Sequence, residues 1–176
     1  MASSLLFPTL AMGMATLVMA AAGEGEMNMV FYMHDNLIRN NDETAFPVAG
    51  MNGSSSDPGK FGTLVVFSDV INERPQMNES NSHNIVGLAK GMYVNTNPVT
   101  GLHFLMVFTV VFQSKEYNGS SLEMQGTARF DQPTSEYAVV GGTGKFRFAR
   151  GYALSTTESI YRGNAVMKLN TTFRTT

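Results

Sequence analysis

The chain has no cysteine among its 176 residues. This absence excludes disulfide bonds, metal sites built on thiolates and cysteine nucleophiles. The fold must therefore be stabilised by a hydrophobic core, with self-association as a further source of stability. A chain of this length buries enough surface to form one such core, so we expect a single domain.

Charge is also scarce, and the motifs of several enzyme classes are missing. The chain has 12 Lys and Arg against 14 Asp and Glu, a net charge of −2 at pH 7, so neither nucleic acid nor an anionic membrane is an expected partner. His34, His83 and His103 stand apart and form no HxH or HExxH motif, so we expect no metal site. No Gly-x-Ser-x-Gly motif is present, and Gly141–Gly144 precedes no predicted helix. We therefore expect no cofactor.

The N-terminal segment is typical of a secretory signal. Residues 1–22 carry no charged side chain, and their broken apolar run ends in three alanines. The run is too short and too interrupted for a membrane span, so we predict a signal peptide over 1–22, a mature domain over 23–176 and an extracellular location. Four Asn-x-Ser/Thr tripeptides agree with secretion and predict N-glycosylation at Asn52, Asn78, Asn118 and Asn170.

From Met27 onward the pattern predicts strands and no helix. Apolar runs rich in aromatic and β-branched residues cover 29–33, 63–67 and 102–112. Turn-forming segments rich in Gly, Asn and Pro separate these runs, which favours an antiparallel barrel or sandwich. The runs are apolar on both faces, so in a barrel one face would meet the lumen and the other a partner subunit.

Two turns are predicted with more detail. Tyr117-Asn118-Gly119-Ser120 predicts a type I′ hairpin turn that leads into a strand over 121–130. Gly141–Gly144 predicts a second tight turn, followed by a strand over 146–153. Period-two spacing would place Phe146, Phe148, Arg150 and Tyr152 on one face of that strand.

Arg150 is the first candidate for chemistry. A guanidinium among three aromatic rings must be paired, stacked on a ring or in contact with water, because an isolated buried charge is costly. The alternative is an edge residue whose charged group extends into solvent.

Two carboxylates end apolar rows. Asp35 shares a strand face with Met29, Phe31 and Met33, and Asp69 ends the row begun by Thr63 in the same way. Each is alternatively a turn-initiating residue. If Asp35 and Arg150 both face a barrel mouth, the carboxyl group would exchange a proton with a phenol or quinone methide, and the guanidinium would bind a phenolate.

A row of small residues ends in a tyrosine. Gly87, Ala89 and Gly91 share a face with Tyr93, which offers a hydroxyl and an aromatic ring beside the space they leave. The alternative is tight packing of this row against a neighbouring subunit.

Several of these segments, in order along the chain, resemble the plant dirigent family. The resemblance implies an eight-stranded antiparallel up-and-down β-barrel, similar to lipocalins and allene oxide cyclase, that assembles as a trimer in the apoplast. The segments that carry it are Phe31–Asp35, Phe61–Asp69, Val86–Tyr93, Tyr117–Leu122 and Val140–Tyr152.

The resemblance also implies site residues and partners. It implies that Asp35, Tyr93 and Arg150 are site residues. Together with the strand pattern, this leads us to expect catalytic roles for Asp35 and Arg150, and substrate contacts for Tyr93, Phe148 and Asp69. The ligand would be a phenolic radical or quinone methide, with radicals supplied by a separate laccase or peroxidase. Lys145, where lignan-forming members commonly have an acidic residue, and the missing cysteine pair place the chain nearer the broader branches of the family.

Three functions therefore remain open. The first is stereoselective coupling of oxidase-generated phenoxy radicals, for example of coniferyl alcohol to an optically active lignan, with no oxidation by the protein itself. The second is an enzyme, a quinone-methide-forming dehydratase or cyclase acting on an isoflavonoid-type phenolic, with Asp35 as the acid. The third is a passive carrier or a component of cell-wall assembly.

Overall fold

The computed structural model describes residues 25–37, 43–51, 57–76, 85–161 and 164–175. The predicted signal peptide, Asn52 and Asn78 lie outside these residues. The described chain forms nine β-strands and a 3-10 helix, η3, in the order β1 (Glu26–Asp35), β2 (Ala45–Ala49), β3 (Leu64–Asn72), β4 (Ile85–Asn95), β5 (His103–Phe112), β6 (Ser121–Arg129), β7 (Ser135–Thr143), η3 (Gly144–Phe146), β8 (Arg150–Tyr161) and β9 (Asn164–Arg174).

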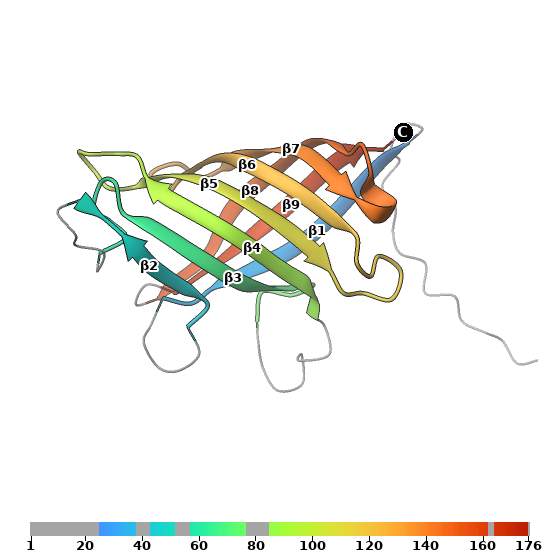
Figure 1. The fold of residues 1–176 in the computed structure, drawn as a ribbon, viewed down its shortest axis with the longest axis horizontal. Coiled ribbons are helices and arrows are strands. Elements are labelled where there is room, and N and C mark those ends of the chain that lie inside the picture. The colour runs from blue at the N-terminus through green and yellow to red at the C-terminus, as the bar shows by residue number, and fades with distance from the viewer. Residues whose placement is uncertain (1–24, 38–42, 52–56, 77–84, 162–163, 176) are drawn as a thin grey trace, which may run out of the picture.

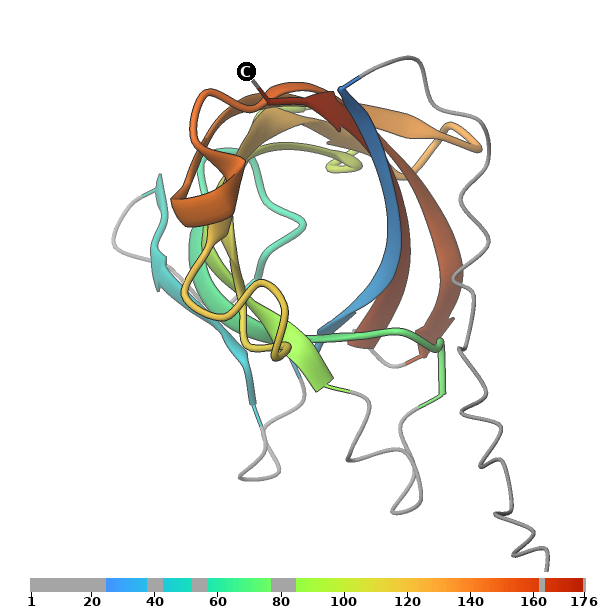
Figure 2. The ribbon, with the colours of Figure 1, turned by 90° about the vertical axis from the view of Figure 1, so that its right-hand side faces the viewer.

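The strands form one antiparallel sheet that closes on itself (Figure 1). Its order is β1-β9-β8-β7-β6-β5-β4-β3-β2, and an additional pairing of β1 with β3 joins the two ends. All strands except the short β2 belong to the closed ring, which Figure 2 shows nearly end-on. The predicted eight-stranded antiparallel barrel is therefore confirmed.

Alternation of side chains along the strands places the core inside the barrel. On β3, for example, Val65, Phe67 and Ile71 are buried while Val66 is exposed, as period-two geometry requires of a strand with one face in the lumen. The same alternation recurs on β5 and β9. Burial of large apolar side chains in this lumen supplies the main stabilisation of the fold.

The two ends of the barrel differ in composition. At the end where β1 begins, hereafter the Phe146 end, η3 inserts Phe146 between Phe112, Tyr117 and Phe173, with ring centroids 5.0 to 5.3 Å apart. Phe146 is fully buried there. At the other end, hereafter the Asp35 end, β1 finishes at Asp35 and the lumen contains polar groups.

The predicted strand over 146–153 is wrong in its first half. The chain leaves β7 after Thr143, and Gly144 has a φ of 58° that starts the 3-10 helix. Hydrogen bonds from the Arg147 amide to the Gly144 carbonyl and from the Ala149 amide to the Phe146 carbonyl then hold a turn instead of a strand. Period-two alternation begins only at Arg150, so Phe146 and Phe148 do not share a strand face with it.

The predicted turn between β5 and β6 is also corrected. The two strands do form a hairpin, but the connection runs from Gln113 to Ser120, longer than two residues. Within it the Ser120 amide donates to the Tyr117 carbonyl over 2.8 Å, and only Gly119 has a positive φ, of 77°. Positive φ at the third of four residues is typical of a type II turn, whereas type I′ requires it at Asn118 as well.

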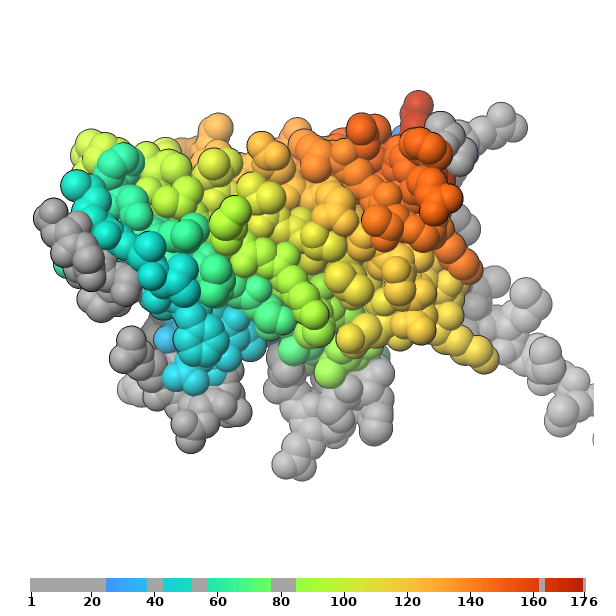
Figure 3. Space-filling model, in the orientation of Figure 1, coloured from blue at the N-terminus to red at the C-terminus, as the bar shows by residue number. Residues whose placement is uncertain are grey.

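The outer face of β3, β4, β5 and β7 carries exposed apolar side chains, and Figure 3 shows the molecule from this side. Val66, Met92, Val107 and Val140 are 39 to 47% exposed. They line a shallow groove of about 370 Å³. Among the described residues, no helix has the length and apolarity needed to cross a membrane.

Candidate functional site

Barrel closure brings Asp35 and Asp69 side by side. His34 of β1 pairs with Val70 of β3, so Asp35 and Asp69 come next on the two strands. Both side chains are buried and point into the lumen. Asp35 ends β1 as predicted, but Asp69 lies within β3, which continues to Asn72. The prediction that Asp69 ends a strand is therefore wrong. The alternative that Asp69 initiates a turn is wrong for the same reason.

The strand β1 separates from β3 at this carboxyl pair. Beyond it, the Ser68 amide donates to the Thr44 carbonyl over 2.8 Å, and β2 replaces β1 as the neighbour of β3. The Thr44 hydroxyl donates to Asp69 Oδ1 over 2.6 Å. Asp35 Oδ1 is buried and has no hydrogen-bond partner among the described residues. The Asp69 carboxyl group is thus held by a hydrogen bond from the protein, while Asp35 Oδ1 is available to a ligand.

Burial raises the pKa of both carboxyl groups to neutral pH or above. Desolvation raises the pKa of Asp35 to about 7. Desolvation, with added repulsion from Asp35, raises the pKa of Asp69 to about 9, against a smaller opposing effect of the Thr44 hydrogen bond. Two adjacent carboxyl groups with little solvent cannot both ionise easily. At pH 7 the pair therefore holds at least one proton, which makes it a proton donor at a pH where ordinary carboxyl groups are bases.

Tyr93 lies on β4 close enough to interact with both carboxyl groups. Its own burial, and then the charges of Asp35 and Asp69, raise its pKa well above the ordinary value for tyrosine. Its hydroxyl therefore remains protonated and is available to donate a hydrogen bond. The structure thus brings together three of the residues predicted from sequence: Asp35, Asp69 and Tyr93.

Aromatic rings continue from this polar group toward the barrel rim. Tyr93 packs against Phe67 and Phe104, with ring centroids 5.9 and 5.6 Å apart, and Phe104 packs edge-on against Phe130 at 5.5 Å. Phe104 and Phe130 are only partly buried. Such rings offer a surface on which an aromatic ligand can stack beside the carboxyl pair.

The row of small residues on β4 serves packing inside the barrel. A Cβ on Gly91 would lie 2.5 Å from Phe108 Cβ and 2.3 Å from the Val107 carbonyl oxygen. The row faces the lumen with Tyr93, and Phe108 occupies the space that Gly91 leaves. Packing of this row against a neighbouring subunit is therefore wrong.

Arg150 and Phe148 lie away from the carboxyl pair. Arg150 pairs with Arg174, which in turn pairs with Glu26 at the start of β1, so it lies toward the Phe146 end. Its exposed side chain is on the outer face, where Nη1 donates to the Ala149 carbonyl over 2.8 Å. Phe148 is 66% exposed with a φ of 66°. The structure therefore does not join either residue to Asp35 in one mouth.

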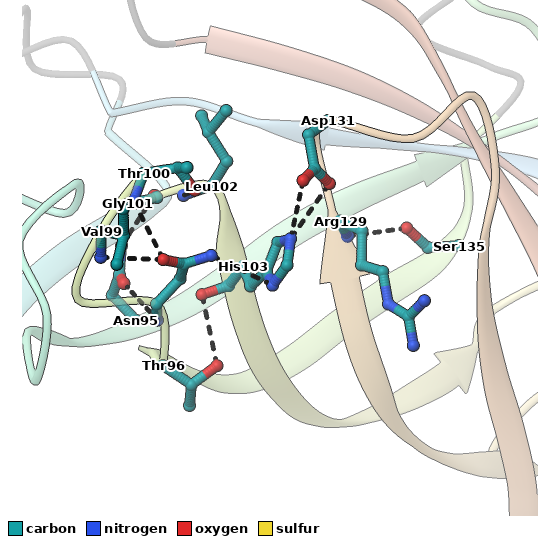
Figure 4. A network of polar contacts seen from close by, with 11 residues as sticks. Asn95, Thr96, Val99, Thr100, Gly101, Leu102, His103, Arg129, Asp131 and Ser135 are labelled. Atoms are coloured by element: carbon teal, nitrogen blue, oxygen red, sulfur yellow. Dashed lines mark hydrogen bonds and ion pairs between the residues drawn. The ribbon is translucent and has the colours of Figure 1, made fainter.

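A polar network that the sequence does not suggest fixes the rim at the Asp35 end (Figure 4). His103, next to Phe104, contacts Asp131 through Nε2 at 2.9 Å. The buried Asn95 amide donates to the Gly101 carbonyl over 2.8 Å. These bonds tie the β4–β5 turn to the β6–β7 turn and so hold the aromatic rim. No spacing motif predicts the network, because its members come from two strands, β4 and β5, and from the β4–β5 and β6–β7 turns.

The two described sequons are on the surface. Asn118 lies in the β5–β6 connection and Asn170 on the outer face of β9, and both side chains are exposed. Their positions are compatible with attached glycans, and occupancy stays a prediction.

The family model of dirigent-like proteins matches residues 26–173. The chain belongs to the dirigent family. This dirigent chain is 37% identical over 140 residues to dirigent protein 1 of Arabidopsis thaliana, covering 80% of the chain and 74% of that relative. It is 33% identical over 168 residues to pterocarpan synthase 1 of Glycyrrhiza echinata, covering 94% and 86%.

Solved structures agree with the assignment to the dirigent family. The dirigent chain is similar to the solved structure of a pterocarpan synthase dirigent protein, with a TM-score of 0.75 and 31% identity over 85% of each chain. The match extends over nearly all the barrel, so the strand pairing that brings Asp35 beside Asp69 belongs to a fold already known in this family.

Proposed function

We propose that this dirigent protein binds a phenolic ligand at the Asp35 end of the barrel and controls its chemistry at the quinone-methide stage. The reaction that the site supports best is dehydration followed by ring closure. The carrying observation is the buried Asp35–Asp69 pair, which holds a proton at neutral pH and in which Asp35 Oδ1 has no partner within the described part of the chain. The pterocarpan synthase relatives support this choice.

The chemistry balances with groups that the site contains. Protonated Asp35 gives its proton to a benzylic hydroxyl, the C–O bond breaks and water leaves. The phenolic proton passes to the carboxylate, so that a quinone methide forms and the acid is restored. A second hydroxyl of the same molecule then adds to the methide carbon, and its proton returns to the carbonyl oxygen. One water is lost overall, and no oxidant is consumed.

The neighbouring residues have defined roles in this proposal. Asp69, bonded to Thr44, stays protonated and keeps a second negative charge away from Asp35. Tyr93 donates a hydrogen bond to the ligand oxygen that becomes the quinone-methide carbonyl. The rings of Phe104 and Phe130 hold the aromatic part of the ligand, and this fixed orientation determines which face of the methide carbon is attacked.

The experiment uses a 2′-hydroxyisoflavanol without oxidant, with the product followed by chiral chromatography. We expect one pterocarpan enantiomer to form, and Asp35→Asn to lower kcat by at least about 100-fold, the usual range for loss of a general acid. The rate of the native protein should fall as the pH rises through about 7, because Asp35 then ionises. Arg150→Ala should leave kcat unchanged, since its guanidinium lies outside the barrel. An unchanged rate in Asp35→Asn would exclude the proposed acid.

A second arm tests stereoselective coupling of radicals. Coniferyl alcohol and a laccase are added to the protein, and the lignan products are separated on the same chiral column. Racemic coupling products, together with turnover in the first arm, support the dehydratase. Enantiomeric excess in this arm without turnover in the first would overturn it in favour of radical coupling with a separate oxidase.

Secretion and self-association complete the proposal. The segment 1–22 and the sequons support an extracellular glycoprotein, in the manner of the dirigent family. The apolar outer face lined by Val66, Met92, Val107 and Val140 supports a homo-oligomer, with a trimer as the expected form. A second copy on this face would remove exposed apolar area from water.

A further inference from the structure

Tyr137 is a fully buried tyrosine that the proposed chemistry does not use. Direct strand pairing puts it in one row with three other lumen residues: Tyr93 pairs with Met106, Met106 with Gly126, and Gly126 with Tyr137. Three strand-to-strand steps separate Tyr93 from Tyr137, about 14 Å along the wall. Around the ring, β7 is four strands from β3 in either direction. Tyr137 therefore starts from the wall opposite Asp69.

A glycine lets the Tyr137 ring extend back across the lumen. A Cβ on Gly126 would lie 2.9 Å from both Cα and Cδ1 of Tyr137, so the ring lies against the bare backbone of β6. Its hydroxyl reaches past β6 to Met106 on β5, and donates to the Met106 sulfur over 3.2 Å. Phe108 packs edge-on against the ring at 5.4 Å and fixes its direction. The hydroxyl thus points toward the strand next to Tyr93.

The acceptor of this hydroxyl's hydrogen bond is weak for so buried a group. Burial raises the pKa of Tyr137 to about 12, with a smaller opposing effect of a hydrogen bond from Ser155. The phenol is therefore neutral and donates its hydrogen bond to a thioether, which is a poor acceptor compared with oxygen. A ligand oxygen that replaces the sulfur would gain a stronger hydrogen bond without leaving a strong acceptor unpaired.

We propose that Tyr137 is a second ligand-binding residue, whose hydroxyl donates a hydrogen bond to an oxygen on the ligand's far ring, away from Asp35. The inference rests on the proposed function and adds the class of ligand: a phenolic compound with two oxygen-bearing aromatic rings. Met106 and the buried Met33 and Met167 lie on the lumen face. Their flexible side chains can repack around such a ligand.

The test compares two non-reactive probes that differ by one oxygen. These are 7,4′-dihydroxyisoflavan and 7-hydroxyisoflavan, which lack a benzylic hydroxyl and cannot lose water. By isothermal titration calorimetry, we expect the native protein to bind the dihydroxy probe about tenfold more tightly, the value of one buried hydrogen bond. Tyr137→Phe should reduce the ratio of the two Kd values to near one. Tyr32→Phe, on the outer face of β1, should keep it.

Each outcome is decisive. A tenfold ratio that survives in Tyr137→Phe overturns the inference and leaves the proposed function standing. Absence of binding by either probe to the native protein overturns both. Met106→Leu removes the sulfur and leaves the hydroxyl in place, so the ratio should be kept or increased, and this variant decides the question if Tyr137→Phe does not fold. Loss of the ratio in Met106→Leu would also overturn the inference.

Discussion

Replacement of Asp69 by asparagine should flatten the pH dependence of stability. Both Asp35 and Asp69 have an ordinary pKa of 3.8, raised by burial to about 7 and about 9 in the folded protein. Between pH 4 and 7 the folded protein therefore holds protons that the unfolded chain has released. Their contribution to stability is fully present below pH 4 and is lost as the pH rises through about 7 for Asp35 and about 9 for Asp69.

The magnitude follows from the number of retained protons. One proton that only the folded state keeps lowers the free energy of unfolding by about 1.4 kcal/mol per pH unit. The two carboxyl groups together give a slope of about 2.7 kcal/mol per pH unit well below pH 7, and Asp69→Asn should halve it. Between pH 4.5 and 6 the loss of unfolding free energy should therefore be about 2 kcal/mol larger in the native protein than in the variant. This is a measurable part of the roughly 5 to 15 kcal/mol that is typical of a domain.

The assay is urea unfolding of the native protein and the variant at several pH values from 4.5 to 8. The asparagine oxygen can still accept the Thr44 hydrogen bond, so the fold should be retained. Glu136→Gln, an exposed carboxyl group on β7, is the matched control and should keep the native slope. Equal slopes in the native protein and Asp69→Asn would show that Asp69 is ionised in the folded state, and would refute the protonated pair.

Two further predictions concern the Phe146 end and the outer face. Phe146→Ala should lower the free energy of unfolding by about 3 to 5 kcal/mol, because it leaves a cavity in a packed aromatic cluster. Phe148 is exposed, so Phe148→Ala should change the free energy of unfolding by less than about 0.5 kcal/mol. Similar urea midpoints for the two variants would contradict the 3-10 turn. For the proposed homo-oligomer, Met92→Lys should give a monomer in light scattering after size-exclusion chromatography, since it places a charge on the apolar outer face. Val30→Lys, equally exposed on β1, should leave the oligomer intact, and an oligomer that persists in Met92→Lys would exclude this face as the interface.

Local sequence patterns predicted strands separated by turns, and the family resemblance predicted that these strands close into a barrel. The apolar runs over 63–67 and 102–112 belong to β3 and β5, and the glycine-containing segments between runs fall at turns. Parity along one strand was also enough to place Asp35 and Tyr93 on lumen faces, since side chains alternate regardless of what the neighbouring strand is. These are properties of a few consecutive residues.

The tertiary structure decided how distant strands meet and where alternation begins. Only the closure of β1 on β3 sets Asp35 beside Asp69, 34 positions later in the chain. Burial in the closed barrel then raises the pKa of both carboxyl groups, and repulsion from Asp35 adds to the rise at Asp69. The 3-10 helix and the turn that follows it have no periodic signature, so the sequence placed Phe146 and Phe148 on one strand face with Arg150, although the strand starts only at Arg150. Strand order and register depend on contacts across the whole barrel, and no local pattern contains them.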